Sequence, residues 1–132
     1  MTMNTRKADS AKPTQRRFTT KVERLGDAVV LRLSGSCTMD VADGLTEAMV
    51  KLAAESVPLI LLELSELDFI ESTGLGGIVA GYLRLRRNQG EVKVVAPMPA
   101  IKDLLDLTRL SQLFPVYKTI EEAMSASSRR PS

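Results

Sequence analysis

Hydrophobic and polar positions along this chain form short runs that predict strands. Residues 18–24 and 28–33 are β-prone and are separated by Leu25-Gly26-Asp27, which has the composition of a hairpin turn. Residues 59–64 and 92–96 are almost continuously apolar. Strands that are buried on both faces of a parallel sheet have this pattern.

Other segments repeat apolar residues at three- and four-residue steps, which predicts helices. They cover residues 41–52, 72–88 and about 99–107. Asp40 is placed to cap the first of them, and Thr119 to cap a last helix that follows a short edge strand at residues 116–118. A strand, a helix and a strand joined by short links form a right-handed crossover. We therefore predict an α/β fold with a four- to five-stranded mixed sheet and amphipathic helices packed mainly on one face.

The two ends of the chain lack this periodicity. Residues 1–17 are polar and basic, so we expect a disordered tail that is dispensable for folding. Residues 125–132 form a second short polar end, which we expect to be flexible. The 132-residue length fits one domain, which we place at residues 18–124.

Composition excludes several kinds of chemistry. The chain has no histidine, which rules out a Ser-His-Asp triad and a histidine metal site. Its one cysteine, Cys37, cannot form an internal disulfide or a thiolate zinc cluster, and we expect it to be a small buried residue. These absences argue against an ordinary hydrolase or metalloenzyme.

Charge and hydropathy also limit the location and the partners. No apolar run approaches the roughly 18 residues of a membrane span, and no apolar stretch follows the basic N-terminus as it does in a secretory signal. We therefore expect a cytoplasmic protein without a membrane partner. The net charge of +2 divides into basic ends and a mildly acidic body. No basic helix or aromatic platform accompanies the basic ends, so we expect no direct contact with nucleic acid.

The most informative segment is the glycine-rich start of the predicted helix at residues 72–88. Ser72 and Thr73 open this helix directly after a buried strand. Four glycines follow within eight residues: Gly74, Gly76, Gly77 and Gly81. Each glycine inside a helix costs up to ~1 kcal/mol relative to alanine. The helix backbone is therefore expected to lie close to something, either the sheet beneath it or a partner above it.

Three phosphate-related interpretations of this segment can be compared. A dinucleotide fingerprint requires G-x-G-x-x-G, and Val79 stands where the last glycine belongs. A P-loop requires Gly-Lys followed by Ser or Thr, and the chain has no such sequence. A hydroxyl at a helix N-terminus can itself accept a phosphate, which then meets free N–H groups and the positive end of the helix dipole. The plain alternative is that Ser72 or Thr73 only caps the helix.

A family resemblance gives this segment a more specific meaning. Glu71-Ser72-Thr73-Gly74-Leu75-Gly76 resembles the Asp-Ser-[Ser/Thr]-Gly-Leu-Gly signature of bacterial anti-sigma-factor antagonists in the STAS family. Residues 62–70 are similar to the strand and loop before that signature. Leu33-Ser34-Gly35 resembles the family's strand end, and residues 104–114 resemble its helix and following turn. The resemblance spans about residues 18–124 and implies the STAS fold.

The resemblance also implies a function. In that family the hydroxyl residue after the acidic one is phosphorylated by a GHKL-type serine kinase that is also the anti-sigma factor. The unphosphorylated protein binds the kinase and frees the sigma factor, and a PP2C-type phosphatase reverses the modification. By this resemblance Ser72 is the phosphorylated residue and a substrate rather than a catalyst, and no cofactor is needed. The residues implied to contact the partner are Thr38, Asp40, Glu71, Thr73, Gly74, Gly76 and Gly77.

Three positions depart from the family pattern and leave alternatives open. Glu71 replaces an aspartate, Thr38 stands where many members have an aspartate with Asp40 nearby, and Arg109 replaces a turn glycine. One alternative is a STAS subunit of a lipid-transport ABC system or a stress-signalling scaffold, without a working phosphorylation site. Another is a nucleotide-binding module at the helix N-terminus, although the motif lacks the lysine or arginine that would meet phosphate charge.

Overall fold

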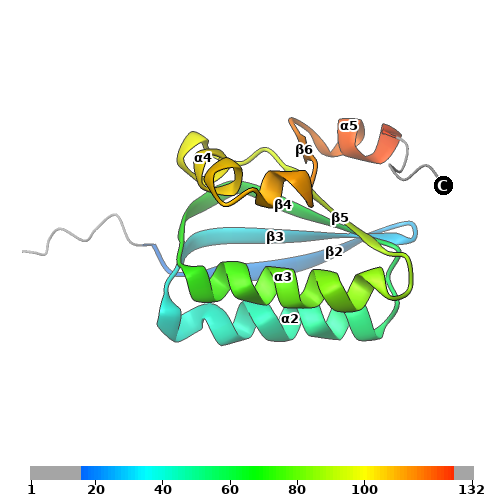
Figure 1. Cartoon of the computed structure of the whole chain (residues 1–132), viewed down its shortest axis with the longest axis horizontal. Coiled ribbons are helices and arrows are strands. Elements are labelled where there is room, and N and C mark those ends of the chain that lie inside the picture. The colour runs from blue at the N-terminus through cyan, green and yellow to red at the C-terminus, as the bar shows by residue number, and fades with distance from the viewer. Residues whose placement is uncertain (1–15, 127–132) are drawn as a thin grey trace, which may run out of the picture.

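The computed structural model describes residues 16–126, and its centre is a five-stranded sheet in the order β2-β3-β4-β5-β6 (Figure 1). The strands are β2 (Thr19–Leu25), β3 (Ala28–Cys37), β4 (Leu59–Ile70), β5 (Glu91–Val95) and β6 (Val116–Tyr117). β2 runs antiparallel to β3, and the other neighbouring strands are parallel. The predicted mixed sheet is confirmed, and so is the parallel pairing of the two apolar strands on either side of the central helix.

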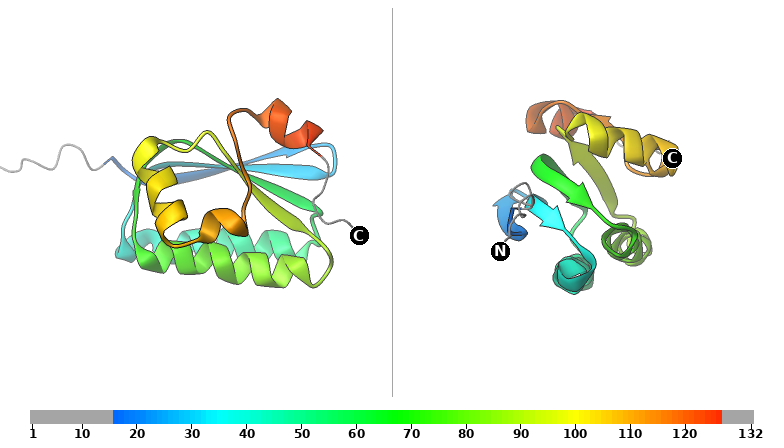
Figure 2. Two further views of the ribbon diagram at one scale, coloured as in Figure 1. Left: turned by 45° about the horizontal axis from the view of Figure 1, so that its top comes forward. Right: turned by 90° about the vertical axis from the view of Figure 1, so that its left-hand side faces the viewer.

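Within the described residues, three helices cover one face of the sheet and a fourth lies over the other (Figure 2). The helices are α2 (Ala42–Ala54), α3 (Ser72–Arg86), α4 (Pro99–Leu107) and α5 (Ile120–Ser125). The first three share one core with alternate residues of β3, β4 and β5. Helix α5 instead buries Ala123 against Val30, Leu61 and Val95 on the opposite face. The prediction of helices packed mainly on one face is confirmed, with α5 as the exception.

Helices α2 and α3 approach each other closely where α3 carries glycine. A Cβ atom at Gly77 would collide with the side chain of Thr46 on α2. A Cβ atom at Gly81 would lie 2.5 Å from Cβ of Met49 on α2. These two glycines therefore allow α3 to pack against α2 of the same chain. The sequence analysis had considered only the sheet and a binding partner as the close neighbour of this helix.

The predicted N-cap at Asp40 is wrong. Thr38 is the N-cap of a short 3-10 turn, η2 (Met39–Val41), and α2 begins only after this turn. The N–H of Val41 bonds the carbonyl of Thr38 at 3.1 Å, which closes the turn. The chain thus makes one tight turn at the end of β3 before it enters the helix, and Asp40 lies inside that turn.

Strand β4 is longer than its apolar run predicts. Its first half pairs with both neighbours, and pairing with β5 ends at Glu63 opposite Val95. Its second half continues alongside β3 alone, as far as Ile70 opposite Cys37. Because this half of β4 pairs with one strand only, it is less enclosed than the first half. Polar residues are therefore tolerated there, and they interrupt the apolar pattern. The consequence is that β3 and β4 together carry the chain out to one end of the sheet.

The first described residues are attached to this end of the sheet. The carbonyl of Arg16 accepts a hydrogen bond of 3.0 Å from the N–H of Ser36, and its guanidinium bonds Asp68 at 2.9 Å. Gly35, at φ 87°, makes room for this path, because a Cβ atom there would collide with the carbonyl of Arg17. Arg16 and Arg17 thus contact the domain, although the predicted boundary put them in the tail. Residues 1–15 and 127–132, which hold the rest of the two predicted tails, lie outside the described residues.

The remaining short elements agree with the sequence pattern. Thr119 caps α5, since its hydroxyl oxygen accepts from the N–H of Glu122 at 3.0 Å, as predicted. A second 3-10 turn, η3 (Leu110–Gln112), joins α4 to β6. No helix in the described part of the chain has the length and apolar character required to cross a membrane.

Candidate functional site

The candidate site forms where two parallel strands end side by side. Cys37 ends β3 opposite Ile70, which ends β4. The N–H of Glu71 donates to the carbonyl of Cys37 at 3.0 Å and ties the two chain segments together. The η2 turn is in contact with α3. Two of the predicted site segments, Thr38 to Asp40 and Glu71 to Thr73, are therefore brought together at one end of the sheet.

The start of α3 leaves two hydroxyl groups free. Glu71 occupies the N-cap position with an extended backbone and makes no side-chain capping bond. Ser72 and Thr73 are the first two helical residues, and both are exposed. Neither hydroxyl has a hydrogen-bond partner within residues 16–126. The alternative that Ser72 or Thr73 only caps the helix is therefore wrong, because Glu71 holds that position.

The backbone of the first turn also offers donors to an anion. The first N–H groups of a helix have no intrahelical acceptor, and the helix dipole is positive at this end. Gly74 and Leu75 direct their N–H groups to the carbonyl of Glu71, at 2.9 and 3.1 Å. The N–H groups of Ser72 and Thr73 are the ones that remain for an anion attached to either hydroxyl.

Two carboxylates make the surroundings of Ser72 acidic. The hydroxyl of Thr38 donates to the carboxylate of Asp40. Burial raises the pKa of the Cys37 thiol, and the charges of Glu71 and Asp40 raise it further. Both carboxylates therefore lie within electrostatic reach of the same buried sulfur. Cys37 is completely buried, which confirms its prediction as a small buried residue.

The predicted glycine contacts divide into two kinds. Gly74 is buried, and a Cβ atom there would lie 2.8 Å from Ile70 and 2.9 Å from the sulfur of Cys37. Gly77 is buried against Thr46. Both face the chain's own interior, so their place in a partner-binding set is not supported by the structure. Gly76 is exposed with nothing within 4 Å of a Cβ position, and it belongs to the accessible surface.

Two exposed apolar side chains near this edge were missed by the sequence analysis. Met39 in the η2 turn is 66% exposed, and Phe69 near the end of β4 is 43% exposed. Phe69 lies between Asp68 and Ile70 in the interrupted part of β4, while Met39 is a single apolar residue between polar ones. No sequence signal marks either as accessible. Single exposed apolar side chains are common on protein surfaces, and these two are of interest because Met39 follows the end of β3 and Phe69 lies next to the end of β4.

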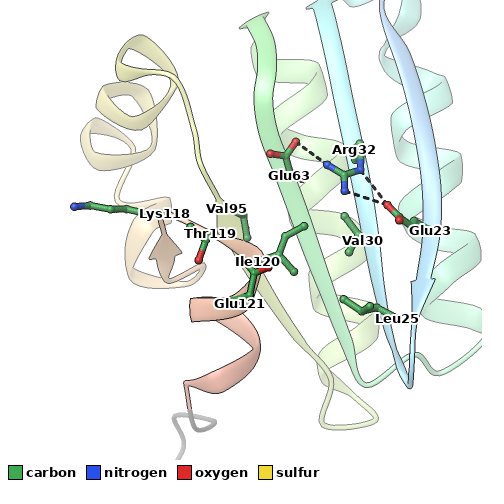
Figure 3. Close-up of a pocket in the computed structure, with 10 residues that line it drawn as sticks. All are labelled: Glu23, Leu25, Val30, Arg32, Glu63, Val95, Lys118, Thr119, Ile120 and Glu121. Atoms are coloured by element: carbon green, nitrogen blue, oxygen red, sulfur yellow. Dashed lines mark hydrogen bonds and ion pairs between the residues drawn. The ribbon is translucent and has the colours of Figure 1, made fainter.

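A groove of about 320 Å³ lies elsewhere, on the sheet face that carries α5 (Figure 3). The guanidinium of Arg32 bridges Glu23 at 3.1 Å and Glu63 at 3.6 Å along its wall. None of the predicted site residues lines it. Residues 16–126 contain no group of three or more acidic or cysteine side chains placed to hold a metal ion.

The fold and this edge define a class of protein. It is an α/β domain with a mostly parallel sheet, in which an exposed serine opens the helix after a central strand. The family model of the STAS domain matches residues 19–123, which is nearly the whole of the described chain. The protein belongs to the STAS domain family.

Individual relatives agree with this assignment. The chain is 28% identical over 109 residues to an anti-sigma F factor antagonist of Paenibacillus polymyxa, covering 80% of this chain and 91% of that protein. A crystal structure of an anti-sigma factor antagonist from Mycobacterium paratuberculosis superposes with a TM-score of 0.74 at 34% identity, covering 83% and 92% of the two chains. The unphosphorylated anti-sigma factor antagonist SpoIIAA has the same fold, with a TM-score of 0.71 at 20% identity over 80% and 93% of the chains.

Proposed function

We propose that this protein is an anti-sigma factor antagonist whose binding to its partner is controlled by phosphorylation at Ser72. The observation that carries the proposal is the state of Ser72: its hydroxyl is exposed and unbonded within the described residues, at the N-terminus of α3. Relatives at 28% and 34% identity are named as anti-sigma factor antagonists, and they align with most of the chain.

The proposed binding surface surrounds Ser72 at the end of the sheet. It consists of exposed or half-exposed side chains from the η2 turn and the start of α3, together with one exposed glycine: Thr38, Met39, Asp40, Glu71, Thr73 and Gly76. Phe69 extends it along β4. Exposed apolar side chains give such a surface affinity, and the carboxylates give it orientation.

Phosphorylation would change this surface far more than the fold. A phosphate adds a charge of about −1.5 to −2 at pH 7. The N–H groups of Ser72 and Thr73 and the helix dipole accommodate that charge within the chain. Towards a partner, however, the phosphate joins the carboxylates of Asp40 and Glu71 in one acidic cluster. A partner that fits the unmodified surface then meets repulsion and a desolvation cost.

The partners follow from the same proposal. The anti-sigma factor is a GHKL-type serine kinase that binds ATP, transfers its terminal phosphoryl group to the Ser72 hydroxyl and releases ADP, and a PP2C-type phosphatase removes the phosphate by hydrolysis. Ser72 is the substrate of these enzymes, and the chain itself acts by binding and needs no cofactor. We place this cycle in the cytoplasm, with no direct contact of the chain with nucleic acid or membrane.

The test is a titration of the cognate kinase with three variants. Ser72→Ala should bind it as the unmodified protein does and take up no phosphate. Ser72→Asp should bind about tens- to thousands-fold more weakly, because losing a charge-sensitive contact costs ~2–5 kcal/mol. Its thermal midpoint should stay close to that of the wild type. Thr73→Ala is the matched control, and mass spectrometry after incubation with ATP should still find one phosphate, on Ser72.

Four results would contradict the proposal. Phosphate on Thr73, or wild-type affinity of Ser72→Asp, would refute the assignment of the switch. If no kinase modifies either residue, the chain works as a STAS subunit of a lipid-transport system or as a signalling scaffold, in line with Glu71 and Thr38 in place of the family's aspartates. Binding of ATP to the isolated chain would instead indicate a nucleotide-binding module.

A further inference from the structure

Strand β2 forms one outer edge of the sheet, and no other strand among residues 16–126 pairs with its free side (Figures 1 and 2). All seven of its residues, Thr19–Leu25, are exposed. The strand pairs with β3 residue by residue, without a bulge, from Thr19 opposite Ser34 to Leu25 opposite Ala28. A regular strand of this kind presents a straight row of backbone donors and acceptors on its free side, to which a further strand can pair.

Among the charged side chains of β2, Glu23 and Arg24 form ion pairs and Lys21 forms none within the described residues. Lys21 lies directly opposite Arg32 of β3, and side chains at opposite positions of an antiparallel pair share a face. Like charges at such positions are destabilising. Arg32 is engaged by Glu23 and Glu63 (Figure 3). Lys21 has no ion pair or hydrogen bond from its side chain within residues 16–126, so its charge faces a cation on one side and the open edge on the other.

The sequence of β2 is self-complementary in one antiparallel register. If two copies pair with Val22 opposite Val22, Lys21 of each copy stands opposite Glu23 of the other. A shift by one residue in either direction loses both of these opposite-charge pairs. The central Val22, 46% exposed in the single chain, would then be covered by its own copy. Edge lysines ordinarily protect against strand pairing, but here each lysine is placed to meet a glutamate.

We propose that two copies of this chain associate through antiparallel pairing of their β2 strands about a two-fold axis at Val22. The two five-stranded sheets become one continuous sheet. Each Lys21 gains a carboxylate that offsets the neighbouring Arg32. Because the strands run in opposite directions across the axis, the two Ser72 edges lie at opposite ends of the joined sheet and stay accessible. The inference is therefore independent of the proposed function.

The test uses charge reversal at the two positions and sedimentation equilibrium of the full chain. The wild type should show a reversible monomer–dimer equilibrium. Lys21→Glu places two like-charge pairs at the contact, and Glu23→Lys does the same with the opposite sign. Each should raise the dimer dissociation constant by about 10- to 100-fold. Circular dichroism checks that both variants keep the wild-type fold.

A mixture of the two variants tests the proposed strand register directly. A Lys21→Glu chain facing a Glu23→Lys chain restores both opposite-charge pairs, so the mixture should form a heterodimer although neither variant dimerises well alone. The double variant Lys21→Glu/Glu23→Lys should likewise regain the wild-type constant. Lys118→Glu, the same charge change just after β6 at the far edge of the sheet, should leave the constant unchanged.

Several results would overturn the proposal. A wild-type protein that remains monomeric up to about 1 mM has no such interface. Unchanged dimerisation of Lys21→Glu would place the contact elsewhere on the molecule. Failure of the mixed variants to associate, with both folded, would rule out the register about Val22.

Discussion

Arg109 has a backbone conformation that suits glycine better than arginine. It lies between α4 and η3 at φ 64° and ψ 13°, in the left-handed region, at the position where the resemblance places a glycine. A non-glycine residue there has its Cβ close to the following carbonyl, which costs about 1–2 kcal/mol. The side chain is exposed, and the N–H bonds the carbonyl of Asp106 at 3.1 Å, a bond that glycine can also make.

Arg109→Gly should therefore stabilise the protein. We expect a gain of about 0.5–1 kcal/mol in the free energy of unfolding, since the relief of strain is partly offset by the greater freedom of glycine in the unfolded chain. Urea denaturation measures the difference. Arg109→Ala is the control, because it removes the same side chain but keeps Cβ. A glycine variant no more stable than the alanine variant would show that the turn is unstrained.

The packing of α2 on α3 provides a prediction at the level of elements. Gly77→Ala should destabilise the protein by about 1–3 kcal/mol, because the new methyl group collides with Thr46 and the helices must separate. Gly76→Ala, one residue earlier, meets open space and should be neutral or stabilising by up to ~1 kcal/mol. Urea denaturation of the pair separates packing from helix propensity. Equal effects at both sites would contradict the close approach of the two helices.

The elements themselves were largely predictable, and the exceptions share a physical cause. Apolar runs identified β4 and β5, because the residues of these strands that pair with two neighbours are buried on both faces. The second half of β4 escaped prediction because one neighbour suffices there and polar residues interrupt the run. The cap at Asp40 was wrong because a 3-10 turn has no apolar period of its own. The placement of α5 on the far face depends on the path of the chain after β6, which local periodicity does not record.

The candidate site was predictable in its chemistry but not in its surface. The motif identified Ser72 and its neighbours, and the structure brings the η2 turn beside them. Which glycines face outward depends on where α2 and Cys37 lie, so Gly74 and Gly77 were assigned to a partner although they pack inside the chain. Met39 and Phe69 were missed for the converse reason, because exposure of an apolar residue is a property of the folded chain.

At the scale of the whole molecule, the N-terminal boundary can be tested by two deletions. Removing residues 1–15 should leave the thermal midpoint nearly unchanged, since their sequence has no periodic apolar pattern that could pack on the domain. Removing residues 1–17 should lower it, because the bond from Ser36 to the Arg16 carbonyl and the ion pair with Asp68 are lost. Differential scanning calorimetry measures both.

Arg16→Ala in the full chain separates the two contributions to that loss. It removes the ion pair and keeps the backbone bond, so its effect should be smaller than that of the longer deletion and should fade at high salt. A lowered midpoint for the shorter deletion would instead mean that residues before Arg16 pack on the domain.

The hydrogen bond from the N–H of Glu71 to the carbonyl of Cys37 has a consequence for what a binding partner can recognise. It joins two segments that are far apart in the sequence, so the surface around Ser72 forms only after β3 and β4 have paired. A linear peptide cut around Ser72 would carry the hydroxyl without the Thr38–Asp40 half of the surface. The epitope is conformational, so a partner that recognises it binds only folded copies of the protein. Nascent, misfolded or damaged copies would not bind the partner and would not change the amount of partner that is bound.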